Sequence, residues 1–164
     1  MPGRGTRGSP GARVPGGRSG RVSPGHACER QPTHWLLVRG SAARPLDGPV
    51  DVDAIGLHRT TRRPAVQAGD TAVLYAAVWQ AVFAVVRITG DPEHDAARER
   101  WAWSFPLRGL VAVPHLDLAP PVEAAGIFPR SVWRHSHIRL EEERFAAACD
   151  VVEAAAAGPR AGRR

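Results

Sequence analysis

The chain has 164 residues, enough for one domain with a hydrophobic core and too few for two domains of ordinary size. Its two cysteines, Cys28 and Cys149, form no Cys-x-x-Cys motif, which excludes a disulfide framework and a zinc site of that type. The net charge of +6 is compatible with a polyanionic partner, but a specific interaction depends on where the charge lies.

All 22 basic residues are arginine, and they are unevenly distributed along the chain. Residues 1–30 carry six Arg and one Glu, and residues 158–164 carry three Arg and no acid. The central segment, 31–157, has 13 Arg against 15 acidic residues, so it is slightly acidic. Specific recognition of nucleic acid therefore requires a local basic patch on this segment.

Residues 1–30 hold eight Gly and four Pro and almost no large apolar side chain. Because such a composition cannot offset the entropy of ordering, a disordered tail is predicted. A translation start at Val14 or Val22 is an alternative that would remove much of it. The tail lacks the apolar region of a signal peptide, and no run approaches the roughly 18 apolar residues of a membrane span. A cytoplasmic protein is expected.

The first half of the domain is predicted to consist of strands. The apolar run 33–38 predicts a buried first strand that includes Trp35 in the core, and residues 55–61 are expected to be extended. A turn at Gly69-Asp70, in which Asp70 bonds its own backbone, leads into an apolar strand, and a second β-branched run covers 82–89. These two runs predict a hairpin.

The second half is predicted to be mixed. Asp91-Pro92-Glu93 predicts a short helix over 92–100 or an acidic loop, followed by another extended stretch. Pro120-Pro121 predicts a helical turn that ends at Gly126, and residues 132–140 predict a late strand. The closing segment predicts an amphipathic helix ended by Gly158, because its apolar residues follow helical spacing: Phe145, Ala148, Cys149 and Val152. The fold class is α+β, with a small, partly closed barrel.

The ordered set of these segments resembles the EVE domain of the PUA-like superfamily, which is related to the YTH and ASCH domains. The segments are HWLLV, AGDTAVLYAA, VFAVVRITG, GDPEHD, WAWSFPLRGLVAV, RHSHIRL and a final helix with Phe145. The resemblance covers residues 33–153. It implies a PUA-like mixed β pseudo-barrel over 31–157, flanked by short helices and a C-terminal helix, with 158–164 as a basic tail. It also implies that the domain binds a flipped, modified base of DNA or RNA and does not catalyse a reaction.

Aromatic residues supply the predicted base-stacking pocket. Trp101, Trp103 and Phe105 would share one face of a strand, and Trp79 would lie at or beside the hairpin tip. Stacking on such rings contributes about 1–3 kcal/mol per base. Packing of Trp101 and Trp103 in the core is the alternative.

Arginines are predicted to contact phosphate. Arg59, Arg62 and Arg63 form the densest basic cluster of the domain, and the planar guanidinium donates two parallel hydrogen bonds. Arg139 is assigned the same role, and His58 is expected on the same surface as the cluster. A solvated loop is the alternative for 59–63.

The pair His135-x-His137 is expected on a strand, with both imidazoles and Arg139 on the polar outer face and Ile138 and Leu140 turned inward. Zinc would need a third protein ligand, from His58 or His115. Polar contacts with nucleic acid are favoured over a metal site. The acidic loop, with Asp91, Glu93, His94 and Asp95, is expected to be solvated.

The sequence therefore predicts a non-catalytic module that recognises a modified, for example methylated, or flipped nucleobase in DNA or RNA, without a cofactor or metal. No nucleophile elbow, phosphate-binding glycine loop or pair of catalytic carboxylates occurs in the sequence. Two alternatives from other classes are kept. One is a metal-dependent enzyme acting on modified nucleobases or nucleosides, and the other is a protein-interaction module.

Overall fold

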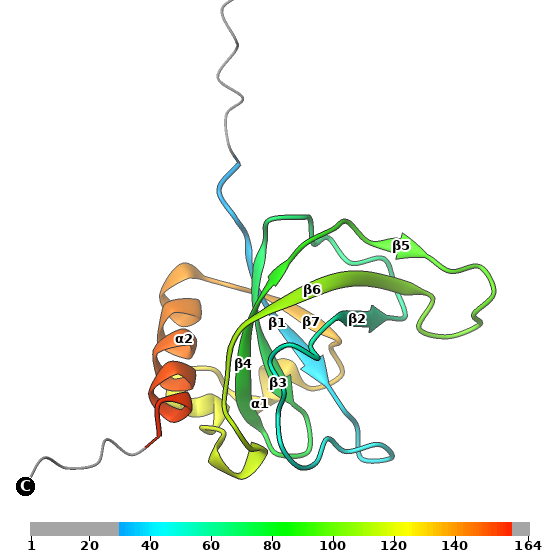
Figure 1. Cartoon of the computed structure of the whole chain (residues 1–164). Coiled ribbons are helices and arrows are strands. Elements are labelled where there is room, and N and C mark those ends of the chain that lie inside the picture. Colours follow the sequence, from blue (N-terminus) through cyan, green and yellow to red (C-terminus); the bar gives the residue numbers. More distant parts are fainter. Residues whose placement is uncertain (1–29, 159–164) are drawn as a thin grey trace, which may run out of the picture. The chain divides into compact units, whose positions relative to one another are not determined.

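The computed structural model of the chain describes residues 30–158 (Figure 1). The predicted N-terminal tail and the alternative starts at Val14 and Val22 fall outside the described residues, as does nearly all of the predicted tail 158–164. A separate compact unit begins at Gln31. None of the helices within 30–158 has both the length and the apolarity needed to cross a membrane.

The described domain is a mixed α+β structure built on one curled sheet (Figure 1). The strands are β1 (His34–Arg39), β2 (Leu57–Thr60), β3 (Thr71–Ala76), β4 (Ala81–Ile88), β5 (Glu93–His94), β6 (Trp103–Ala112) and β7 (His137–Leu140). The helices are η1 (Leu116–Leu118), η2 (Val122–Ala125), α1 (Pro129–Val132) and α2 (Glu142–Ala156).

The strand order is β2-β6-β4-β3-β1-β7, and β5 pairs with β6. Only β1 and β3 run parallel within the described sheet. The sheet curls into a half-barrel whose two end strands are β2 and β7 (Figure 1). Register fixes which side chains share a face, because directly paired residues point the same way.

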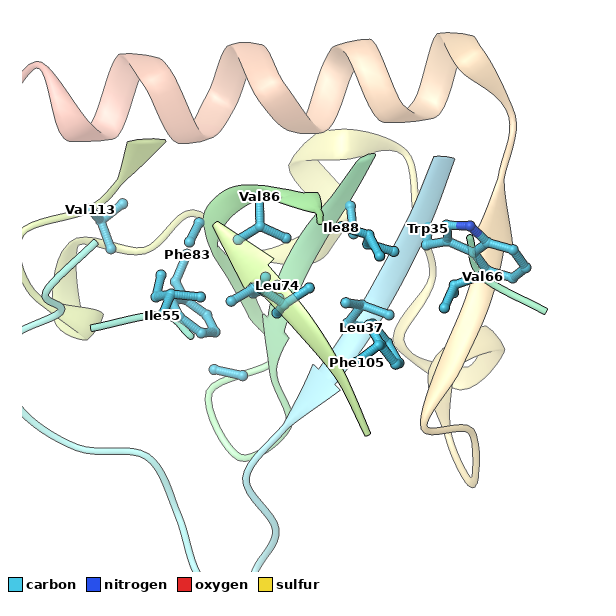
Figure 2. Packing of buried hydrophobic residues seen from close by; sticks show 14 of the residues in the cluster. Trp35, Leu37, Ile55, Val66, Leu74, Phe83, Val86, Ile88, Phe105 and Val113 are labelled. Atoms are coloured by element: carbon cyan, nitrogen blue, oxygen red, sulfur yellow. The ribbon is translucent and has the colours of Figure 1, made fainter. Parts of the chain in front are cut away.

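Two hydrophobic clusters lie on opposite faces of this sheet. Along β1, Trp35 and Leu37 belong to the inner cluster with Phe105 (Figure 2). Leu36, between them, belongs to the outer cluster. The outer cluster includes Val152 of α2, so the helix covers that face. Apolar residues on both faces of β1, β3 and β4 explain their nearly continuous hydrophobic runs.

The predicted hairpin is confirmed as β3 and β4, and Trp79 lies in its connecting turn. The C-terminal helix is also confirmed, with Ala148 and Val152 buried. The turn at η2 ends at Gly126, whose φ of 70° lies in the left-handed region that favours glycine.

Two predicted elements differ from the structure. Of the two alternatives for residues 92–100, the helix is wrong, because β5 pairs with β6 and the remainder is a largely exposed loop of turns and bends. Of the predicted strand 132–140, only the last part forms a strand, β7. The chain before it first forms α1, which has Pro129 in its first turn.

Asp70 joins the start of β3 to the start of β1. Its fully buried carboxylate accepts the backbone N–H of Thr33 (3.0 Å), the backbone N–H of Gln67 (3.0 Å) and the Trp35 indole N–H (2.9 Å). The prediction that Asp70 bonds the backbone of its own turn is confirmed by the bond from Gln67. Asp70 also links segments that are more than 30 residues apart in sequence.

Gly109 of β6 is expected to tolerate no side chain. A Cβ atom there would lie 2.2 Å from the carbonyl oxygen of Val52, and backbone cannot move aside as a flexible side chain can. We expect Gly109→Ala to lower the free energy of unfolding by about 1–3 kcal/mol, as overpacking does. Urea denaturation would measure it. Gly56→Ala is the matched control, because a Cβ at Gly56 meets nothing within 4 Å.

Candidate functional site

A cluster of polar side chains lies inside the half-barrel, where β2 and β7 approach each other. His58 pairs with Phe105 and His137 pairs with Leu37, so both imidazoles share the inner face with the core. Arg39, at the end of β1, and His137 both act electrostatically on the ring of His58. We call Arg39, His58 and His137 the inner polar cluster.

His58 is the most unusual member because it is buried and neither ring nitrogen makes a well-aligned hydrogen bond, although the Ser136 backbone is close enough to act on it. Its side chain is 2% exposed, and neither ring nitrogen has a hydrogen-bonding partner. Burial above all, followed by the charges of Arg39 and His137, lowers its pKa to about 3, against a weaker opposing effect of the Ser136 backbone. The ring is therefore neutral at pH 7, with one donor and one acceptor nitrogen that have no well-aligned partner. Such groups are rare in protein interiors and call for a specific explanation.

Arg39 connects this cluster to a cavity. Burial lowers the pKa of its guanidinium, and it forms no ion pair with any carboxylate among residues 30–158. It lines a cavity of about 190 Å³, which we call the Arg39 cavity. The other walls are Leu46, Asp47, Pro49, Val50, Asp51, Ala54, Ile55, Leu74, Phe83 and Leu116.

The Arg39 cavity combines an apolar floor with polar groups of both kinds. Leu74 and Phe83 belong to the inner core, while two aspartates lie on the loop side. Asp47 accepts the Gly48 N–H and Asp51 accepts the Asp53 N–H, so both carboxylates are anchored to their own loop. The cavity is smaller than the roughly 300–1,000 Å³ of typical ligand sites, and it suits a single small ring.

His137 is half-buried and oriented by its neighbours. Its Nδ1 lies 3.0 Å from the Ser136 hydroxyl, and its ring meets the edge of Trp35 with centroids 5.8 Å apart. Burial first, and His135 second, lower its pKa. The Trp35 indole is fixed in turn by Asp70, so the sheet positions this imidazole.

A second aromatic and basic group lies at the far end of β6. Trp103 meets His94 edge-on at 4.9 Å, and the guanidinium carbon of Arg63 lies 5.4 Å from its ring centroid. Trp103 pairs with Thr60 of β2 and His94 of β5. This arrangement leaves Trp103 half-buried and partly covered by Arg63.

The predicted base-stacking residues do not form one pocket. Phe105 is fully buried in the core, so its predicted stacking role is wrong. Trp101 precedes β6 with a φ of 58° and does not continue the strand face. Trp79 lies beyond Ala81 of β4, whereas Trp103 lies beyond the opposite end of the β4–β6 pairing.

Trp79 is the predicted aromatic residue that lies beside the Arg39 cavity. Its indole N–H donates to the Leu46 carbonyl at 2.9 Å, and its side chain is 40% exposed. Leu46 is a wall of the cavity, so the hairpin turn supports the loop that closes it.

The predicted phosphate-binding arginines are spread over two strands and a loop. Arg62, Arg63 and Arg139 are exposed, whereas Arg59 is half-buried and its Nη1 has no partner. On β7, Arg139 pairs with Trp35, which places it on the inner side.

Two histidine predictions are wrong. His58 is not a surface residue, and His135 precedes β7 as an exposed loop residue that shares no strand face with His137. His137 and Arg139 point inward, and Ile138 and Leu140 instead pack in the outer cluster. The prediction assumed that one face of β7 is solvated, whereas both faces are covered in part.

Among residues 30–158, no three His, Cys, Asp or Glu side chains are close enough to share a metal ion. His115, which a zinc site would have needed, instead bonds Asp117. The sequence analysis did not predict Arg39 as a site residue. The one feature of the sequence that could have indicated it is its position as a charged residue directly after the apolar run HWLLV.

The fold is one that other proteins share. The NMR structure of Rpa0253 from Rhodopseudomonas palustris superposes with a TM-score of 0.54 at 15% identity, over 74% of this chain and 94% of that one. The described domain is thus an α+β half-barrel of the same fold as Rpa0253.

Two further structures resemble the chain less closely. Atu2648 from Agrobacterium tumefaciens has a TM-score of 0.45 at 16% identity, over 80% of this chain and 99% of that one. A hypothetical protein from Leishmania major has a TM-score of 0.45 at 13% identity, over 75% and 96%. No protein-family model matches the sequence, and no curated protein matches it significantly.

Proposed function

We propose that this protein is an EVE-type, non-catalytic binding module of the cytoplasm that recognises a modified or flipped nucleobase of DNA or RNA in the Arg39 cavity. The observation that carries the proposal is the inner polar cluster. Arg39 has no acidic partner and lines a ring-sized cavity, and the buried His58 beside it has no well-aligned hydrogen bond, so the folded protein holds hydrogen-bonding groups that a ligand could use.

A nucleobase matches this chemistry. Its edge displays carbonyl oxygens, ring nitrogens and amino groups, and arginine binds such acceptor edges with two parallel hydrogen bonds. Arg39 would meet acceptors, while Asp47 and Asp51 would meet amino groups. The apolar floor at Leu74 and Phe83 would contact the ring and any added methyl group. The neutral imidazoles of His58 and His137 belong to the same cluster as Arg39, and we expect the two rings to change position when the Arg39 side chain moves to bind a base.

Three other residues of the predicted site are assigned to the rest of the nucleic-acid strand. Exposed Arg62 and Arg63, with Trp103, form a basic and aromatic patch that we assign to phosphate and to a neighbouring base. We expect binding to weaken as salt rises, because counterions are released from each neutralised phosphate.

Titration of the full chain with fluorescent oligonucleotides tests the proposal. The panel carries cytosine, methylated or hydroxymethylated cytosine, adenine or N6-methyladenine at one position. We expect one modified base to be preferred, and Arg39→Gln to weaken its binding about tenfold or more, the effect of losing a charged hydrogen bond. Arg108→Gln is the matched control, because it removes the same charge from an exposed position on β6. Equal or absent binding across the panel contradicts the proposal.

A further inference from the structure

The short helix α1 carries the two most exposed large apolar side chains of the described domain. Phe128 at its start and Trp133 at its end are each 71% exposed. Between them, Val132 is 3% exposed and packs in the outer cluster, so it fixes the turn to the sheet. The two exposed aromatic rings therefore flank a residue that is anchored to the sheet.

This surface is also basic. Residues 124–140 contain three arginines and two histidines and no acidic residue. The Arg134 guanidinium carbon lies 4.5 Å from the Trp133 ring centroid, which covers one side of the indole. We call Phe128, Arg130, Trp133 and Arg134 the α1 surface. Its alternation of rings and positive charges suits a partner that offers both flat rings and negative charges.

A hollow of about 250 Å³ joins the α1 surface to the end of the sheet. Its walls are Val38, Tyr75, Ala77, Gln80, Pro129, Arg130, Val132, Trp133, Arg134 and His135. One acidic group acts here, since Glu123 is a lesser cause, after burial, of the raised pKa of Tyr75.

The hollow and the Arg39 cavity lie back to back across the same end of the sheet. Val38 and Tyr75 line the hollow, while the adjacent residues Arg39 and Leu74 line the cavity. Successive residues of a strand point to opposite faces, so the two sites are separated by the sheet alone. The turn that holds Trp79 and Gln80 forms the rim between them.

We propose that the α1 surface binds single-stranded nucleic acid next to the base held in the Arg39 cavity, with a neighbouring base stacked on Trp133 and its phosphates on Arg130 and Arg134. The inference rests on the proposed function and specifies its substrate as a single strand. Stacking requires an unpaired base with a free face, which a duplex does not offer. The strand would cross the rim at Trp79 and reach the opposite face of the sheet.

The test measures anisotropy of labelled oligonucleotides with the full chain. An eight-nucleotide strand carries the preferred modified base at its centre, and the matching nucleoside monophosphate serves as competitor. We expect Trp133→Ala to weaken binding of the strand roughly 5- to 100-fold, as loss of one stacking ring does, and to leave the monophosphate affinity unchanged. The control Leu110→Ala removes another exposed apolar side chain, from β6, and should change neither affinity.

The other possible results distinguish failure of the α1 surface from failure of the proposed base recognition in the Arg39 cavity. Unchanged binding of the strand to Trp133→Ala overturns the α1 surface, even if the modified base is still preferred. A loss on Trp133→Ala without any base preference supports the α1 surface and contradicts the reader function. Displacement of the strand by a glutamate-rich peptide of equal charge, or equal binding of the duplex, overturns the single-strand assignment. Unfolding midpoints should match for all variants, because these side chains are exposed.

Discussion

Replacing Asp70 with alanine is expected to lower the free energy of unfolding by about 3–5 kcal/mol, the cost of removing one partner from a buried charged interaction. The loss follows from three donors that would lose the carboxylate: the buried Trp35 indole N–H and the partly buried backbone N–H groups of Thr33 and Gln67. Each hydrogen bond to a charged group contributes about 1.5–3 kcal/mol. Because whole domains are stable by about 5–15 kcal/mol, this variant should be near the limit of folding.

Urea denaturation followed by tryptophan fluorescence would measure the effect of Asp70→Ala. Asp53→Ala is the control, since Asp53 is an exposed loop residue and its loss should cost less than about 0.5 kcal/mol. Asp70→Asn should lie between the two, because an amide retains one oxygen but opposes a donor with its NH₂ group. If Asp70→Ala were as stable as the control, the link between β1 and β3 would have to be carried by other contacts.

Replacing His58 with leucine is expected to stabilise the protein by about 1–3 kcal/mol at pH 7, because it removes a buried polar ring that has no partner. His58→Leu should also abolish selective binding of the modified base, because it changes the surroundings of the Arg39 guanidinium. A gain in stability with a loss of function is the behaviour of residues kept for activity. His94→Leu, at an exposed position, is the control for stability.

The pH dependence of stability gives a second signature of His58. Its folded pKa of about 3 lies below its ordinary value of 6.5, so the unfolded chain takes up the proton first as pH falls. The pH-dependent cost of keeping His58 neutral is absent above about pH 6.5, and it lowers the stability of the folded protein progressively toward pH 3. At about 1.4 kcal/mol per unit, wild type should lose roughly 2–3 kcal/mol more than His58→Leu between pH 7.5 and 4.5. Parallel urea midpoints for both proteins over this range would show that folding does not lower the pKa of His58.

The elements predicted best are those whose signal is local. The hairpin of β3 and β4 and the helix α2 follow from residue periodicity within single segments, and Gly126 ends η2 as predicted. The late strand was predicted too long because β-branched and polar residues of 132–136 are compatible with either extended or helical backbone. Tertiary packing of Val132 decides the outcome.

The candidate site depends on long-range pairing, which the sequence does not reveal. Alternation correctly places Trp103 and Phe105 on one face, but it cannot tell that Phe105 meets Leu37 in the core while Trp103 meets Arg63 at the edge. Likewise, His58 and His137 come together only because the sheet curls and brings β2 toward β7. Arg39 becomes a candidate binding residue only because it lines the cavity, whose walls come from several segments that are separate in sequence.

The most direct test of the reader function is an NMR titration of the histidine imidazoles in the full chain. The seven histidines give few and resolvable ring signals. On adding the tightest-binding modified oligonucleotide, the signals of His58 and His137 should shift, because Arg39 and His137 both act on the His58 ring. The signals of His34, at the opposite end of β1 from Arg39, should stay unchanged. Arg39→Gln should remove these shifts. If saturating oligonucleotide left His58 and His137 unmoved, the Arg39 cavity would not be the base-binding site.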